Sequence, residues 1–186
     1  MVFYYGFTDK NGSFTLQNLF AIATPEHSKA LWEAIKLSVV STIICLLLAY
    51  PLAMILSNIR TAQKSFIILI FILPMWMNFL LRTLAWQTLL EKKGVINSVL
   101  SALHLPALNI INTPAAIILG MVYNFLPFMV LPIYNVLIKI DKNLIHAARD
   151  LGANGVKTFL HITLPLSISG VTSATTMVFV PALTTF

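Results

Sequence analysis

Four long apolar stretches constrain this chain more than any other feature of its sequence. They cover residues 34–57, 65–90, 114–138 and 166–186. A helix needs about 20 apolar residues to cross the hydrocarbon core of a bilayer, so each stretch is long enough to be a transmembrane helix. Because backbone polar groups inside lipid must be paired within the helix, we predict an all-α, polytopic helical membrane protein.

The composition agrees with a membrane protein and argues against other classes. The chain has 186 residues, of which 58% are hydrophobic and 10% are charged, whereas soluble domains carry about 25% charged residues. The net charge is +6, but the basic residues are scattered through the loops and form no run, so no nucleic-acid partner is expected. The single cysteine, Cys45, lies inside the first apolar stretch and can form no disulfide within the chain.

The distribution of basic residues predicts which loops face the cytoplasm. With four spans, residues 58–64 and 139–165 lie on one side of the membrane, and residues 1–33 and 91–113 lie on the other. The first pair of loops holds six Lys and Arg residues, and the second pair, although longer, holds four. Positive charge accumulates in cytoplasmic loops. We therefore predict that 139–165 is cytoplasmic and that 1–33 and 91–113 are extracytoplasmic loops.

The spans contain polar and aromatic residues that simple membrane anchors lack. Asn78, Asn124 and Asn135 are costly when they face lipid, so we expect them to point into the helix bundle, either as helix–helix contacts or along a transport pathway. Arg82 is the ionisable residue that the pattern places within the membrane, near a span end where its long side chain can reach the surface. The candidate pathway residues are Trp76, Asn78, Arg82, Trp86, Tyr123, Asn124 and Phe128.

The sequence lacks the motifs of catalysis and of energy capture. It contains no P-loop, H-E-x-x-H, C-x-x-C or G-x-S-x-G pattern, and its four histidines are too dispersed for a metal site. We therefore predict no catalytic residue, no metal and no enzyme activity. Carriers driven by protons or sodium usually need intramembrane Asp, Glu or His, which these spans lack. Energy for transport should then come from another protein.

The loop 139–165 has the pattern of two short helices joined at a glycine. Asp141 is a suitable N-cap for a helix over 143–151, and Gly152 suits a left-handed position after it. Taken alone, the loop could be an amphipathic connector at the membrane surface or a docking site for another protein. Apolar residues at helical spacing form two stripes in it: Leu144, Ala147, Ala148 and Leu151, then Val156, Phe159, Leu160 and Thr163.

The segment "HAARDLGANGVKTFLHITLPLSISG" resembles the EAA loop of ABC-importer permeases. That pattern is roughly E-A-A-x-x-x-G and then, after nine further residues, an apolar residue, any residue, Leu and Pro. It is matched here by Ala147, Ala148, Gly152, Ile162, Leu164 and Pro165. His146 departs from the pattern, because the family has Glu at this position.

The resemblance implies a type I ABC-importer permease fold. In that family the short helix of the loop is a coupling helix, which rests in a cleft on a cytoplasmic ATPase. The residues that the resemblance assigns to this coupling are Leu144, His146, Ala147, Ala148, Asp150, Leu151, Gly152, Ala153, Phe159 and Pro165.

Further segments, "LPMWMNFLLRTLAWQTLL", "GVINSVL" and "YNFLPFMVLPIY", make the sequence most similar to the first permease subunit of spermidine/putrescine importers. Family chains have six spans, so this one would be truncated: it would begin at the end of the first span and stop within the fifth, which leaves 166–186 as a partial transmembrane helix. The resemblance implies a multi-pass protein of the bacterial inner membrane with no cofactor of its own, since the partner ATPase binds ATP. The implied partners are a cytoplasmic ABC ATPase dimer, a second permease subunit, an extracytoplasmic solute-binding protein, membrane lipid and a polyamine substrate.

The transported solute is indicated by this resemblance and not by the residues. The spans offer no acidic side chain to pair with a polycation. Aromatic side chains such as Trp76 and Trp86 could give cation–π contacts of about 0.5–2 kcal/mol each, or could simply fill the bundle. Three alternatives stay open: a permease of a related ABC importer for another small solute, an ATP-independent channel or carrier, and a membrane anchor or assembly factor.

Overall fold

The computed structural model of the chain describes residues 25–59, 69, 71, 73–92, 94–106, 110–111 and 113–185. Within these residues every element is helical, as predicted. The long helices are α3 (Pro25–Asn58), α7 (Pro114–Leu137) and α10 (Leu164–Thr185), and the shorter ones are α5 (Phe79–Leu90), α6 (Val95–Ala102), α8 (Lys142–Asp150) and α9 (Gly155–Thr158). A 3-10 turn, Leu73–Trp76, precedes α5, and a π-helical turn, Phe159–Thr163, joins α9 to α10.

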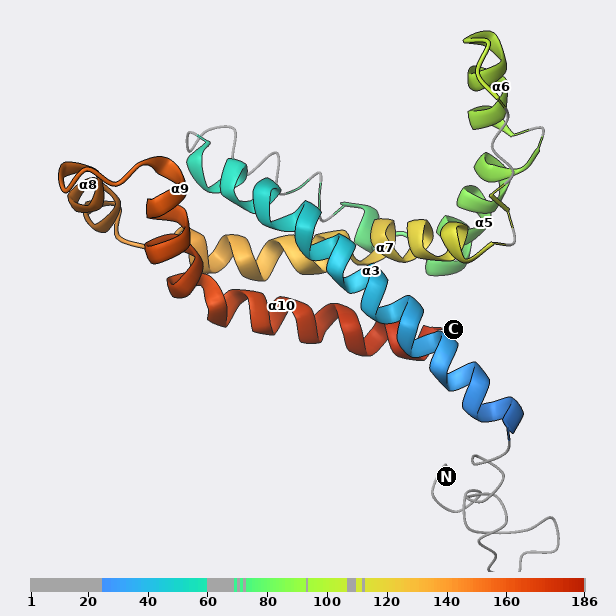
Figure 1. Cartoon of the computed structure of the whole chain (residues 1–186). Coiled ribbons are helices and arrows are strands. Elements are labelled where there is room, and N and C mark those ends of the chain that lie inside the picture. Colours follow the sequence, from blue (N-terminus) through green and yellow to red (C-terminus); the bar gives the residue numbers. More distant parts are fainter. Residues whose placement is uncertain are drawn as a thin grey trace, which may run out of the picture.

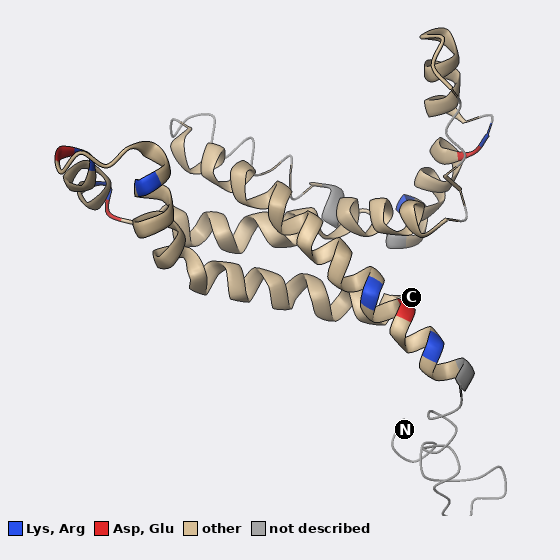
Figure 2. Cartoon of the chain, viewed as in Figure 1, with Lys and Arg blue, Asp and Glu red and all other residues tan. Residues whose placement is uncertain are grey.

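Three helices of the described part are long and apolar enough to cross a membrane: His27–Asn58, Pro114–Leu137 and Gly155–Thr185. The first and the last are longer than the spans expected over 34–57 and 166–186. Charged residues gather at the ends of the bundle, and the central turns of these three helices carry none (Figure 2). The additional turns thus extend the apolar spans into the polar surroundings.

The stretch expected to span the membrane over 65–90 is interrupted. The chain bends at Met77, and Asn78 then starts α5 by accepting a hydrogen bond from the backbone N–H of Leu80 at 2.8 Å. α5 has 12 residues and is therefore about 18 Å long, which is less than the roughly 30 Å of hydrocarbon in a bilayer. Most of residues 60–72 lie outside the described part, so the complete span stays a prediction.

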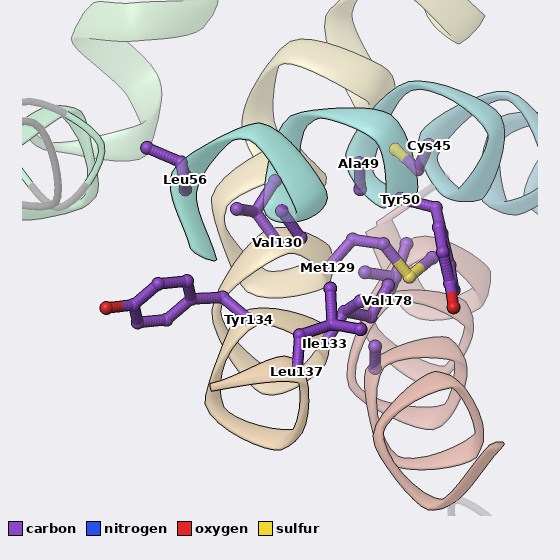
Figure 3. Close-up of a cluster of buried hydrophobic side chains, with 12 residues drawn as sticks. Cys45, Ala49, Tyr50, Leu56, Met129, Val130, Ile133, Tyr134, Leu137 and Val178 are labelled. Carbon is purple, nitrogen blue, oxygen red and sulfur yellow. The ribbon is translucent and has the colours of Figure 1, made fainter. Parts of the chain in front are cut away.

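α3, α7 and α10 pack against one another and form the core (Figure 1). Small side chains let helix backbones approach closely, which is a common basis of helix association in lipid. Larger side chains of α7, including Met129 and Ile133, fill the space between the helices together with Val178 of α10 (Figure 3). The small buried residues of α3 recur every three or four positions and are Ser38, Ser41, Cys45, Ala49 and Ala53.

Gly170 marks a close approach of α10 to α7. A Cβ atom added to this buried glycine would lie 2.9 Å from Cγ2 of Val136 and 3.2 Å from the carbonyl oxygen of Pro132. A distance of 2.9 Å is shorter than real Cβ atoms show, and 3.2 Å is tighter than most of their contacts, so a side chain at Gly170 would require Val136 or the α7 backbone to shift.

Gly170→Ala is therefore expected to lower the thermal unfolding temperature of the purified chain, because overfilling a close contact costs about 1–3 kcal/mol. Gly120→Ala on α7 is the matched control, since a Cβ atom there has no neighbour within 4 Å. Alanine also favours the helix over glycine by about 0.5–1 kcal/mol. Unfolding temperatures measured in one detergent compare the variants. An unchanged temperature for Gly170→Ala would contradict the close contact.

The loops on either side of α7 lie at opposite ends of the bundle (Figure 1). α8 and α9 are at the end where α3 and α7 finish and α10 begins, whereas α6 lies beyond α5 at the other end. The segments 139–165 and 91–113, expected on opposite sides of the membrane, are therefore separated by the length of the bundle. The assignment of the α8 end to the cytoplasm stays a prediction from the basic residues.

Candidate functional site

The loop between α7 and α10 folds into a hook, residues 141–163, which consists of α8, a glycine turn, α9 and the π turn. As predicted, Asp141 caps α8, and its Oδ1 accepts a hydrogen bond from the backbone N–H of Asn143 at 2.9 Å. Asn154 caps α9 similarly by accepting from the N–H of Lys157 at 2.8 Å. Both helices of the hook thus begin at side chains that pair with otherwise open backbone donors.

Gly152 ends α8 in the left-handed conformation that the sequence predicted, with a φ of +82°. Its N–H donates to the carbonyl of Arg149 at 2.9 Å, and the N–H of Ala153 donates to the carbonyl of Ala148 at 3.0 Å. These two bonds form a Schellman motif, which satisfies carbonyls at the end of the helix. Since residues other than glycine are strained in this conformation, Gly152 allows the turn between the two arms of the hook to form without strain.

The hook leaves four large apolar side chains uncovered. Leu151 is 89% exposed, Val156 66%, Leu160 49% and Leu144 46%. We call these four residues the apolar row. Ala147 beside them is exposed as well, whereas Ala148 is buried on the inner side of α8. The stripe predicted on α8 is therefore divided: Ala148 points toward the bundle, whereas its other three residues are exposed and could contact a partner protein.

The opposite face of α8 is basic. Lys142, His146 and Arg149 are spaced i, i+4 and i+7, and together they line a cavity at the base of the hook. Asp150 is exposed and does not line this cavity. His146 therefore faces away from the apolar row, although the resemblance placed it among the coupling residues.

Phe159 joins the hook to the bundle. Its ring packs edge-on against the ring of Tyr50 in α3, with centroids 5.4 Å apart. The Tyr50 hydroxyl in turn forms a hydrogen bond of 2.6 Å with Oγ of Ser167 in α10. Sequence reasoning missed Tyr50 and Ser167, although a hydroxyl inside an apolar span already signals that a buried partner is needed.

Pro165 lies in the first turn of α10, directly after the π turn. A proline cannot donate a hydrogen bond to the carbonyl four residues earlier, and its ring crowds that carbonyl. In the π turn the N–H of Leu164 donates to the carbonyl of Phe159, five residues earlier. This wider turn accommodates the proline. α9, the π turn and α10 therefore form one continuous helix, where separate segments over 139–165 and 166–186 were expected.

Four of the seven candidate pathway residues meet between α5 and α7. Arg82 is only 7% exposed; its Nη1 donates to Oδ1 of Asn124 at 3.0 Å, and its Nη2 donates to the carbonyl of Met77 at 3.1 Å. Its Nε has no hydrogen-bond partner within the described residues. Arg82 was expected to extend toward the membrane surface, but it turns inward because Asn124 offers an acceptor. Trp86 and Tyr123 pack edge-on with ring centroids 5.0 Å apart.

A cavity of about 620 Å³ lies between α5, α7 and the end of α10. Its wall combines aromatic rings with amide and hydroxyl groups, which can bind a small polar cation through cation–π contacts and hydrogen bonds. Sequence reasoning missed Gln87 and Thr185, because a single Gln or Thr near a span end belongs to no pattern. The lining residues of most chemical interest are Trp86, Gln87, Asn124, Phe125 and Thr185.

The other candidates lie apart from this cavity. Trp76 is 87% exposed, and Asn78 is engaged as the cap of α5. Phe128 packs edge-on against Phe125, with centroids 6.4 Å apart, and adjoins the buried core. Asn135, which we expected inside the bundle, is exposed, because it lies on the face of α7 opposite the buried Ile133.

Comparison with known proteins gives a family match over most of the chain. Residues 37–186 match the family described as "Binding-protein-dependent transport system inner membrane component". The chain is 36% identical over 174 residues to the spermidine/putrescine transport system permease protein PotB of Haemophilus influenzae, with 92% of this chain and 61% of that protein covered. PotB of Escherichia coli is 35% identical over 175 residues, with 93% and 64% covered. The chain thus spans less than two thirds of the length of these relatives.

Two further proteins are similar at a greater distance. The inner membrane ABC transporter permease protein YdcU of Escherichia coli is 31% identical over 179 residues, with 89% of this chain and 57% of that protein covered. A chain in the crystal structure of a bacterial alginate ABC transporter, solved with an alginate-bound periplasmic protein, superposes with a TM-score of 0.71 at 17% identity. This match covers 87% of the present chain and 58% of the other. The second likeness shows that the fold is that of an ABC-transporter membrane subunit, as predicted.

Proposed function

The chain belongs to the family of inner membrane components of binding-protein-dependent transport systems, and we propose that it acts as a permease subunit of an ABC importer for polyamines. Family membership confirms the resemblance based on the EAA loop and places the chain in the inner membrane. In the proposed function, ATP hydrolysis by a partner protein drives alternating access of the substrate path to the two sides of the membrane.

The apolar row is the observation that carries this proposal. Its members lie on and beside a short pair of capped helices, which are joined by a left-handed turn at Gly152. Exposed apolar side chains on a rigid element are typical of a protein interface. Its four side chains are exposed, as insertion into a cleft of a cytoplasmic ATPase requires. Phe159 then connects the docked hook to α3 and α10 through Tyr50 and Ser167.

The polyamine substrate is supported by the relatives and is compatible with the cavity. Both PotB proteins are named as spermidine/putrescine permeases and share 35–36% identity with this chain. Trp86 and Phe125 can contact a passing ammonium group, and the carbonyl oxygen of Gln87 can accept a hydrogen bond from it. Arg82 next to the cavity opposes tight binding of a cation. Selective capture therefore belongs to a separate extracytoplasmic solute-binding protein.

The remaining partners follow from the same proposal. A dimer of ABC ATPases binds the ATP, and a second permease subunit completes the substrate path. A related importer for another small solute is the second candidate, since YdcU, whose name states no substrate, is also 31% identical to this chain.

Vesicles that contain the chain together with its ATPase, second permease and solute-binding protein test the proposal. Uptake of labelled spermidine is expected only when ATP is present on the side of the membrane that carries the ATPase. An ATPase variant that lacks the P-loop lysine is expected to lower uptake to background. An excess of unlabelled putrescine should compete, whereas sulfate should not. Uptake at the same rate without the ATPase would instead favour an independent channel or carrier.

A further inference from the structure

The cavity at the base of the hook has the character of an anion site. Its volume is about 460 Å³, and it lies between α8, α9 and the ends of α3 and α7. Among the described residues, the ionisable side chains that line it are Lys142, His146 and Arg149, all of them basic. Neither Asp141 nor Asp150, the carboxylates nearest in the sequence, belongs to its lining.

The positive charge of this cavity is not compensated within the described part of the chain. No ion pair or hydrogen bond joins the side chains of Lys142, His146 or Arg149 to a described carboxylate. Of the neutral polar side chains of the wall, Ser57, Asn58 and Thr158 donate hydrogen bonds to backbone carbonyls three or four residues earlier. The cavity therefore keeps a positive potential that attracts an anion.

His146 increases this positive character. The EAA pattern has Glu at this position, and a carboxylate there would lie on the same face of α8 as Lys142 and Arg149, one turn from each. Histidine removes that negative charge from the wall. The departure of this chain from the pattern thus changes the basic cavity and leaves the apolar row on the opposite face unaltered.

The remaining wall indicates which anion fits. It is apolar, and part of it, Met54 and Leu137, comes from the ends of α3 and α7, where the headgroups of a bilayer lie. The rest is Ile138 and Ile140 after α7, with Ile145 and Phe159 of the hook. A free phosphate ion would leave this apolar surface wet, whereas a phospholipid places its phosphate among the basic side chains and the upper part of an acyl chain against the wall. Lys and Arg bind phosphate oxygens through charge-assisted hydrogen bonds, and basic pockets between membrane helices bind lipid headgroups.

We propose that this cavity binds the phosphate headgroup of an anionic phospholipid and so ties the base of the hook to the membrane surface. The proposal depends on the cavity and on the position of the span ends. It does not depend on the transported solute or on an ATPase, so it can fail or hold independently of the proposed function.

Native mass spectrometry tests the proposal. The full chain is mixed in detergent with equal amounts of phosphatidylglycerol and phosphatidylcholine, and the lipids that stay bound after release from the detergent are identified. The unmodified chain is expected to retain phosphatidylglycerol in preference. The double variant Lys142→Gln/Arg149→Gln is expected to retain it roughly tenfold less, because each basic residue near a membrane surface contributes measurably to anionic lipid binding. The matched control, Lys139→Gln/Lys157→Gln, removes the same charge from exposed residues of the same loop that do not line the cavity, and should behave like the unmodified chain.

His146→Glu provides a second variant, which restores the family residue and should also lower phosphatidylglycerol retention, while His146→Gln should lower it less. Equal retention by the cavity variant and its control would overturn the proposal. Inorganic phosphate added alone distinguishes the two sources of the same chemistry. If phosphate displaced the lipid at equal concentration, the cavity would be assigned to a soluble anion and the lipid would be excluded.

Discussion

Leu151→Asp is expected to weaken association of the chain with the proposed partner ATPase strongly and to leave folding and membrane insertion intact. The side chain is 89% exposed, so a carboxylate at this position disturbs no internal contact. In a docked complex the same carboxylate would lie unpaired in an apolar interface, and central apolar contacts of this kind contribute about 2 kcal/mol or more. The dissociation constant, measured by surface binding of the purified ATPase to the chain in nanodiscs, should rise roughly 30-fold or more.

Asn143→Asp is the matched control for this variant. It also adds a negative charge to an exposed position of α8, but Asn143 does not belong to the apolar row. A carboxylate in the first turn of a helix is favourable, so α8 should remain folded. If both variants bound the ATPase as well as the unmodified chain, the hook would be the amphipathic connector that the sequence left open.

Asn124→Leu is expected to destabilise the chain more than the double variant Arg82→Met/Asn124→Leu. Oδ1 of Asn124 accepts from Nη1 of Arg82 at 3.0 Å, and both residues are buried. Removing the amide alone leaves a buried guanidinium with one partner fewer, in addition to its unpaired Nε. Loss of one partner of a buried charge costs about 3–5 kcal/mol, whereas replacing both members with apolar side chains of similar size costs far less.

Thermal unfolding of the unmodified chain, both single variants and the double variant forms a double-mutant cycle for this pair. The loss of stability in Arg82→Met should lie between those of Asn124→Leu and of the double variant. This substitution leaves a neutral amide oxygen unpaired, at a cost of about 1–3 kcal/mol. Additive effects of the two substitutions would mean that the side chains do not interact, and would remove Arg82 from the candidate pathway cluster.

Local rules predicted the parts of the structure that depend on neighbouring residues. The apolar stretch over 114–138 is the helix Pro114–Leu137, because length and hydrophobicity alone decide whether a segment can cross a bilayer. Asp141 and Gly152 were assigned correctly as cap and turn, since each acts on backbone groups within a few residues of itself. The EAA pattern also identified the family, because its spacing records the geometry of a whole helix pair.

Features that depend on residues far apart in the sequence could not be predicted. The inward turn of Arg82 requires Asn124, which lies 42 positions later, and the Tyr50 hydroxyl is paired with Ser167, 117 positions later. Which face of α8 is exposed could not be predicted either, because the sequence pattern separates apolar from polar positions and does not separate outward from inward ones. The π turn was not predicted either. A proline in a sequence usually indicates that a helix ends, whereas here the helix continues through Pro165.

The continuity of the helix from Gly155 to Thr185 has a mechanical consequence. Its 31 residues form a rod about 46 Å long. Val156 and Leu160 lie at one tip, and Thr185, at the other tip, contributes to the wall of the cavity beside Trp86 and Asn124. A rod pivoting by about 10° near Phe159 sweeps its far tip through several ångströms. If the hook docks on an ATPase as proposed, a displacement at Val156 and Leu160 is therefore carried along one helix to the cavity wall at Thr185.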